Sequence, residues 1–127
     1  MIVLVLGEPV STNRLYSLNR QGYTKAGRRI KRFRYSDAYK AWMDETDVCL
    51  LGQYRAKDSI SGPYTVRLEV SSKSRKDADG MLPGLLDYLV KRGITSDDKL
   101  CMHPEAFKLD SVPAGQCRVI IEQWVAP

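Results

Sequence analysis

The stretch YTVRLEVSSKSRKDADGMLPGLLDYLVKRG, residues 64–93, places a strand pattern directly before a helix pattern. In its first part apolar and polar side chains alternate, which predicts a β-strand with one solvated face. The side chains expected to point inward are Tyr64, Val66, Leu68 and Val70, and those expected to point outward are Thr65, Arg67 and Glu69. In its second part the apolar residues Leu82, Leu85, Leu86, Leu89 and Val90 recur at the spacing of one helix face. Pro83 is acceptable near the start of such a helix, and Gly93 is a natural end for it.

The flanking sequence adds strands and one more helix. Residues 1–6 (MIVLVL) indicate a buried strand, too short to span a membrane and without the basic lead of a signal peptide. Ser36 is a suitable N-cap for a helix over about residues 37–51. The apolar side of that helix is expected to carry Tyr39, Trp42, Met43 and Val48. Residues 103–111 and 115–125 are expected to form a closing pair of strands around the turn SVPAG.

The order strand, helix, strand, helix, strand, strand predicts an α+β fold, in which two main helices pack on one side of a mixed β-sheet. A length of 127 residues corresponds to one domain, residues 1–127.

Positive charge is concentrated in one segment. The chain has 20 basic and 15 acidic residues, and eight of the basic residues but no acidic one lie between residues 9 and 36. These eight are Arg14, Arg20, Lys25, Arg28, Arg29, Lys31, Arg32 and Arg34, and Tyr16, Tyr23, Phe33 and Tyr35 are interleaved with them. A basic segment with aromatic side chains suits a phosphate backbone with exposed bases nearby. A solvated hairpin is the alternative, and the lack of any counter-charge favours nucleic acid.

Two pairs of acids lie on either side of the second predicted helix. Asp77 and Asp79 precede it, and Asp97 and Asp98 follow it. With ten aspartates in the chain, each motif is expected about once by chance, so neither is informative alone. The helix separates the pairs by about 15 Å, and they meet only if residues 94–98 double back along it.

If the four carboxylates do meet, their mutual repulsion requires a cation. Carboxylate oxygens at a hydrated site suit Mg²⁺ or Mn²⁺. Beside a basic surface, such an ion predicts hydrolysis of a phosphodiester, which is nuclease chemistry.

Other kinds of site find little support in the sequence. A lone His103 excludes nucleases that need several histidines, and the chain has no glycine-rich phosphate loop. The cysteines Cys49, Cys101 and Cys117 follow neither a disulfide nor a zinc pattern. They suit a reducing compartment, so we expect the protein in the cytoplasm.

Three motifs, in order and at matching spacing, resemble those of the RusA-type Holliday-junction resolvases, small proteins often carried by phages and prophages. The segment PVSTNRLY, residues 9–16, is similar to the family's amino-terminal Pro-x-Ser-x-Asn-Arg-x-Tyr. The series DADG, LLDYL, RG and SDD, within residues 77–98, is similar to its central Asp-x-Asp-Asn, Leu/Phe-Asp-x-Leu, Gly and Asp-Asp series. The resemblance covers most of the chain.

The resemblance implies a homodimeric, Mg²⁺-dependent endonuclease of DNA recombination and repair, which binds four-way junctions and nicks opposed strands symmetrically. By position, Asp77, Asp79 and Asp98 would be the catalytic, metal-binding acids, and Asp97 would support the metal. The residues expected to bind DNA are Asn13, Arg14, Tyr16, Arg20, Lys25, Arg28, Arg29, Lys31, Arg32, Arg34, Lys73, Arg75 and Lys76.

Two positions depart from the family pattern. Gly80 stands where the family usually has asparagine, and Pro83 stands where it usually has a catalytic lysine. Proline cannot supply a cation, and the nearest lysines by sequence are Lys73, Lys76 and Lys99. Two alternatives therefore stay open. One is a non-catalytic protein that binds branched DNA, and the other is a small basic ribonuclease that works without metal through Arg14 and Tyr16.

Overall fold

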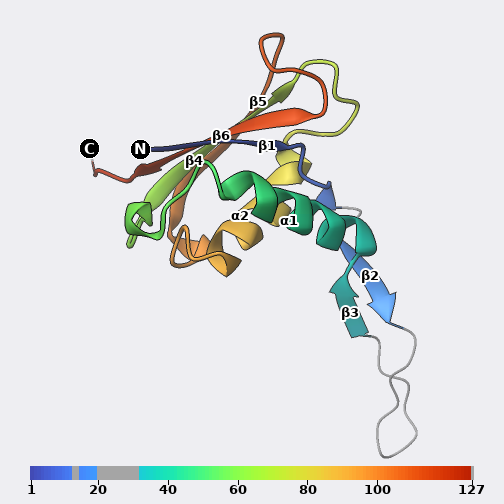
Figure 1. Ribbon diagram of the computed structural model, residues 1–127, viewed down its shortest axis with the longest axis horizontal. Helices are drawn as coiled ribbons and strands as arrows, with labels where there is room; N and C mark the ends of the chain where they lie inside the picture. Colours follow the sequence, from blue (N-terminus) through green and yellow to red (C-terminus); the bar gives the residue numbers. More distant parts are fainter. Residues whose placement is uncertain (13–14, 20–31, 127) are drawn as a thin grey trace, which may run out of the picture.

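Four strands form the main sheet of the computed structural model, which describes residues 1–12, 15–19 and 32–126. They are β1 (Ile2–Gly7), β4 (Tyr64–Ser71), β5 (Cys101–Leu109) and β6 (Gln116–Gln123). Their order across the sheet is β1-β6-β4-β5 (Figure 1). β4 and β5 run parallel, whereas β6 is antiparallel to both β1 and β4. The predicted mixed sheet is therefore confirmed.

The parallel pair is joined by the second helix, α2 (Leu82–Lys91). Parallel neighbours need a crossover connection, and a helix commonly supplies it. A single 3₁₀ turn, η3 (Asp79–Met81), leads into α2, with Pro83 in the first turn of the helix as predicted. The predicted end is also confirmed, because Gly93 has a φ of 71°, a conformation that favours glycine.

The last two strands are not the closing pair that the sequence suggested. Both exist, but β4 lies between them, and residues 110–115 carry the chain past its end. Burial accounts for the arrangement. Cys117, Val119 and Ile121 of β6 are each at most 1% exposed, which suits a central strand. No residue of β5 is buried, which suits an edge.

The first helix, α1 (Asp37–Leu50), begins where predicted, and the Ser36 side chain accepts a hydrogen bond from the backbone N–H of Tyr39 at 3.1 Å. Its buried side chains are Tyr39, Trp42, Thr46 and Leu50. Val48, expected on this apolar side, is instead 69% exposed. Thr46 takes a core position because its hydroxyl donates to the Trp42 carbonyl at 2.6 Å, which satisfies its polar group inside the protein.

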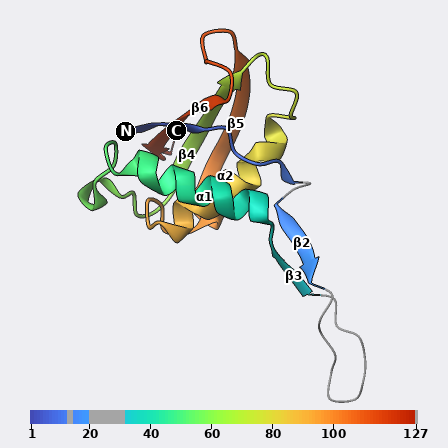
Figure 2. The ribbon, with the colours of Figure 1, turned by 45° about the vertical axis from the view of Figure 1, so that its right-hand side comes forward.

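Both helices cover the same face of the sheet, and the opposite face is bare (Figures 1 and 2). Side chains from α1, α2 and three of the main strands meet in one core, which includes Tyr39, Trp42, Tyr88, Leu68 and Val119. No helix among the described residues is long and apolar enough to cross a membrane.

A separate two-stranded sheet projects away from the main sheet (Figures 1 and 2). It pairs β2 (Tyr16–Asn19) with β3 (Arg32–Tyr35) in antiparallel register, Tyr16 opposite Tyr35. These two strands belong to the basic segment. Residues 13–14 and 20–31 of that segment lie outside the described residues.

Candidate functional site

Asp77 and Asp79 lie in the connection that follows β4. The Asp77 carboxylate accepts the backbone N–H of Asp79 at 3.2 Å, which is the local turn expected of aspartate before a short helix. Both side chains are exposed at the start of η3. The turn therefore holds the two acids close together, and it leaves the Asp79 carboxylate without a hydrogen bond to its own loop.

Asp97 and Asp98 lie in the connection from α2 to β5. Asp97 is the N-cap of a second 3₁₀ turn, η4 (Asp98–Leu100), and accepts the backbone N–H of Lys99 at 3.0 Å. That hydrogen bond is the main reason why the pKa of Asp97 is held below its ordinary value. The Tyr64 hydroxyl donates to the Asp97 carbonyl at 3.1 Å and ties the turn to β4. Asp97 thus serves the local backbone, and Asp98 is the exposed acid beside it.

The connection that follows α2 begins by turning back against the last turn of the helix. The backbone N–H groups of Ile94 and Thr95 both point to the carbonyl of Leu89, at 2.9 and 3.3 Å. The segment after the helix is thereby folded against its last turn.

Asp79 and Asp98 line the same cavity, which we call the acidic cavity. Its volume is about 450 Å³. The described residues that line it are Thr12, Leu15, Asp79, Leu82, Pro83, Leu86, Asp87, Asp98 and Pro104. The apolar residues among them form a surface between acids that come from opposite ends of α2, and none of these lining residues is basic.

Asp77 lines a neighbouring cavity of about 430 Å³, which we call the basic cavity. Its lining residues are Ser11, Thr12, Arg75, Lys76, Asp77 and Gly80. Thr12 belongs to both cavities, and its hydroxyl donates to the Gly80 carbonyl at 2.7 Å. The segment before β2 is in this way fixed against η3, between the two cavities.

The described residues of one chain bring two of the predicted acids to one cavity and the third to the next. Across residues 1–12, 15–19 and 32–126, no group of three or more His, Cys, Asp or Glu side chains could hold a metal ion. Two carboxylates on one open cavity still match the way Mg²⁺ is held by one or two carboxylates, several waters and substrate phosphate oxygens. The donor type therefore suits Mg²⁺, although the described residues do not form a complete group of metal ligands.

The predicted DNA-binding residues fall into three groups. Arg75 and Lys76 line the basic cavity, and Lys73 is exposed in the same loop. Tyr16, Arg32 and Arg34 lie on β2 and β3, where the backbone is described. Asn13, Arg14, Arg20, Lys25, Arg28, Arg29 and Lys31 lie outside the described residues. Of the three lysines nearest to Pro83, Lys76 lines a cavity of the site, whereas Lys73 and Lys99 line neither.

Sequence reasoning missed Thr12, Glu8 and Asp87. Thr12 stands at an unspecified position of the motif in residues 9–16, and nothing in the sequence distinguished Glu8 from a polar strand end. Asp87 lies on α2 four residues after Pro83, so helical spacing could have identified it as a neighbour of the cavity. The Tyr35 hydroxyl donates to the Asp87 carboxylate and connects the base of the β2–β3 sheet to this cavity.

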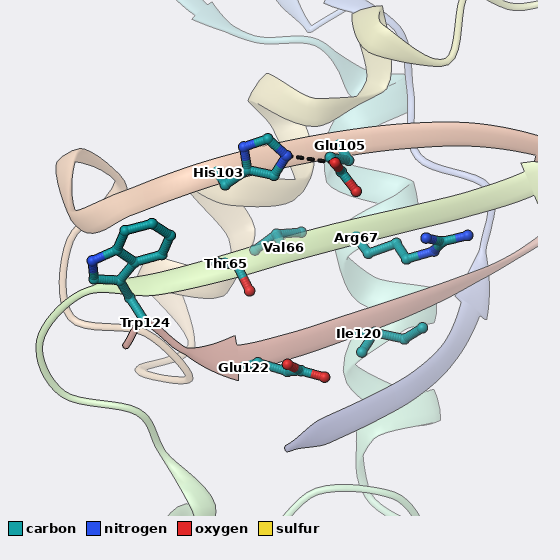
Figure 3. A pocket seen from close by; sticks show the side chains of 8 residues that line it. All are labelled: Thr65, Val66, Arg67, His103, Glu105, Ile120, Glu122 and Trp124. Carbon is teal, nitrogen blue, oxygen red and sulfur yellow. Dashed lines mark hydrogen bonds and ion pairs between the residues drawn. The ribbon is translucent and has the colours of Figure 1, made fainter. Parts of the chain in front are cut away.

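The bare face of the sheet holds a third cavity, of about 250 Å³, with a different chemistry (Figure 3). Its lining residues are Thr65, Val66, Arg67, His103, Glu105, Ile120, Glu122 and Trp124, and His103 pairs with Glu105. Charges of both signs lie side by side here, so this face lacks the positive character that a phosphate backbone attracts.

Glu69, expected on a solvated face, is 5% exposed on this side of the sheet. Burial opposes its ionisation, but hydrogen bonds from Arg118 and Arg67 outweigh that effect and lower its pKa. Arg67 also lies over the Phe107 ring, 4.0 Å from its centre. The arginine side chains cover the carboxylate, which explains how an acid can be buried on an open face.

No protein-family model matches the chain, and the search of curated proteins found no match to it.

Proposed function

We propose that the chain is a RusA-type endodeoxyribonuclease that resolves four-way DNA junctions by paired, Mg²⁺-dependent nicks. The observation that carries the proposal is the cavity shared by Asp79 and Asp98, acids that come from opposite ends of α2. The motif resemblance and the basic segment supply the substrate class. The proposed place of action is the cytoplasm of a bacterial host, with a phage or prophage origin.

In this mechanism Asp79 and Asp98, which line the acidic cavity, would hold the divalent ion. When bound, Mg²⁺ would supply an activated water and neutralise charge on the phosphate. Asp77 orients Asp79, because its carboxylate holds the Asp79 backbone N–H. Asp77 also lines the basic cavity and would be a further ligand of the ion. Paired nicks in opposed strands require two sites, so the proposed assembly is a homodimer.

The test compares Asp79→Asn and Asp98→Asn with Asp110→Asn, a change at an exposed acid in the connection from β5 to β6. A labelled four-way junction and a linear duplex of the same sequence are incubated with and without Mg²⁺. We expect the two cavity variants to lose at least ~10²-fold in nicking rate while junction binding survives, and Asp110→Asn to behave as the wild type. Undiminished cleavage by Asp79→Asn would contradict the assignment.

A non-catalytic protein that binds branched DNA is the second candidate. It is favoured by the lack of a three-ligand metal group among the described residues and by the presence of Pro83 at the position of the family's lysine. The same assay separates the two candidates, because a pure binding protein shifts the junction in a gel without any Mg²⁺-dependent product.

A further inference from the structure

The basic cavity has the composition of an anion site. It joins two cations, Arg75 and Lys76, to the hydroxyl-bearing residues Ser11 and Thr12, with Asp77 as its one acid among the described residues that line it. The adjoining acidic cavity offers carboxylates and no cation among its described lining residues. A phosphodiester that approached Asp77 would therefore find positive partners in the basic cavity.

Lys76 is held in place by an acid from another part of the chain. Its ammonium lies 3.9 Å from a carboxylate oxygen of Glu8 and 3.5 Å from the carbonyl of Pro9. Glu8 follows β1 directly, and its own backbone N–H donates to the Gly115 carbonyl at 3.0 Å. The lysine side chain is thus directed by a residue anchored to the main sheet.

Ser74 closes a small network around the same carboxylate. Its hydroxyl donates to Glu8 and also lies 3.3 Å from the backbone N–H of Lys76, which donates to it. Glu8 therefore fixes two residues of the loop that leads into Asp77. We call Glu8, Ser74 and Lys76 the lysine clamp.

The exposed fractions show how the clamp differs from a solvated ion pair. The Glu8 side chain is 15% exposed, whereas the Lys76 side chain is 36% exposed. An ion pair between two exposed side chains contributes little, but here the acid is mostly shielded, and Lys76 lines the basic cavity. An ammonium group has three N–H donors, and among the described residues only the Pro9 carbonyl lies within hydrogen-bond distance of it, at 3.5 Å, which leaves donors for a ligand.

We propose that Lys76 binds a non-bridging oxygen of the DNA phosphate that enters between the two cavities, and that Glu8 is the positioning residue for Lys76. This inference rests on the proposed function and names the group that contacts the substrate phosphate at that site. Glu8 acts through Lys76 and does not touch the substrate. The clamp supplies the positive charge that Pro83 cannot.

The first experiment measures single-turnover nicking of a four-way junction in Mg²⁺ by Lys76→Gln, Lys76→Arg, Glu8→Gln and the double variant. The control is Lys57→Gln, which changes an exposed lysine of the 3₁₀ turn Ala56–Asp58. We expect Lys76→Gln to lose ~10²-fold in rate while the junction Kd in Ca²⁺ changes much less. Lys76→Arg should retain part of the rate, and Lys57→Gln should match the wild type.

Glu8 is tested by its coupling to Lys76. Glu8→Gln should slow nicking by about tenfold in the wild-type background and have little further effect when Lys76→Gln is already present. An equal loss in both backgrounds would show that Glu8 acts on the fold alone and would overturn its positioning role. If the wild type nicks the junction and Lys76→Gln nicks it at the same rate, the inference is overturned, whereas the proposed function still holds.

A second measurement does not depend on cutting. Lysine acetylation is mapped by mass spectrometry in EDTA, with and without the four-way junction. The junction should protect Lys76 several-fold more than Lys57. Equal acetylation of Lys76 in the two samples overturns the inference, even if the wild type proves unable to nick DNA and the proposed function fails.

Discussion

At the scale of single residues, Gly84 decides how closely α2 can pack. An added Cβ there would lie 3.3 Å from Cδ1 of Leu15 and 3.3 Å from Cε1 of Tyr39. The Tyr39 hydroxyl also donates to the Gly84 carbonyl at 2.8 Å. Considered from the sequence alone, a glycine in the first turn of a helix only lowers the helix propensity. The requirement for glycine follows from the folded structure, in which Leu15, before β2, and Tyr39 of α1 pack against this position.

Replacing Gly84 should therefore be far more damaging than replacing Gly80. Gly84→Val introduces branched atoms into a filled space and should lower the free energy of unfolding by about 2–3 kcal/mol. At Gly80 an added Cβ meets nothing closer than 3.7 Å. The variant Gly80→Ala should therefore change the free energy of unfolding by less than about 0.5 kcal/mol. Urea unfolding of both variants checks the difference, and similar values would contradict the packing described for Gly84.

Asp47 links the two helices through a polar network. Its carboxylate accepts hydrogen bonds from Nε and Nη2 of Arg92, at 2.6 and 2.8 Å, and from the Tyr88 hydroxyl at 2.7 Å. The Arg92 guanidinium is the main reason why the pKa of Asp47 lies below its ordinary value of 3.8. Because the folded state favours the ionised carboxylate, this stabilisation is present above pH 3.8 and is lost as the pH falls through the lowered pKa.

The variant Asp47→Asn should lose about 1 kcal/mol of unfolding free energy near neutral pH. The gap between wild type and variant should narrow in acid, since protonation removes the same charge from the wild type. Urea unfolding at several pH values measures this gap. A gap that stays constant down to the lowest pH at which the protein folds would contradict the role given to the Arg92 pair.

At the scale of elements, the two edges of the main sheet are protected differently. At β1, the Gln53 side chain accepts the Val5 N–H at 2.6 Å and donates to the Val5 carbonyl at 2.8 Å, so an amide side chain imitates a neighbouring strand. At β5, Pro104 lacks an N–H and cannot take part fully in another ladder.

Removing the amide at Gln53 should both destabilise the protein and expose the edge. Gln53→Ala should cost about 1–2 kcal/mol and increase self-association at high concentration. Gln53→Glu keeps an acceptor but loses the donor, so an intermediate loss is expected. Urea unfolding and size-exclusion chromatography check these outcomes, and an unchanged Gln53→Ala protein would show that the edge needs no such protection.

The sequence predicted the helices and strands better than it predicted which strands lie next to one another in the sheet. Alternation in β4 and the leucine spacing in α2 are local signals, and both led to the correct elements. The position of β6 between β1 and β4 depends on which strand buries more of its side chains, a property of the assembled core. Val48 was expected on the buried side of α1, but Thr46 is buried there instead. A threonine that bonds back to the helix can be buried, which an apolar pattern cannot reveal.

For the candidate site, too, the sequence predicted local features but not their arrangement in space. The acids at both ends of α2 were visible in the sequence. Their meeting in one cavity was not, because a helix of 10 residues is about 15 Å long. Leu82, Leu86 and Pro104 line the cavity between these acids, and that cavity exists only in the folded chain. Glu8 was missed because its partners, Ser74 and Lys76, are more than 60 residues away.

At the scale of the whole molecule, charge and architecture are segregated. The eight basic residues between residues 9 and 36 contrast with 12 basic and 15 acidic residues in the rest of the chain. The described part of that segment forms the separate β2–β3 sheet, outside the main sheet. Removal of its far end should thus affect binding more than folding.

Replacement of residues 20–31 by an Asn-Gly turn removes five of the eight basic side chains. The two-residue turn then joins Asn19 to its strand partner Arg32. The melting temperature should change by only a few degrees, whereas junction affinity should fall. The slope of log K against log salt should decrease in magnitude by about 4. An unchanged slope would show that these residues do not contact phosphates. A protein that no longer folds would contradict the independence of the two sheets.

The crossover through α2 also makes this helix a spacer between the two halves of the site. Each inserted residue would advance the far acid by about 1.5 Å and rotate it by about 100° around the axis. The length of α2 is therefore constrained in addition to its packed side chains. Sequences that share the proposed activity should keep the interval from Asp79 to Asp98 fixed, and insertions should gather instead in the turn that leads from β5 to β6.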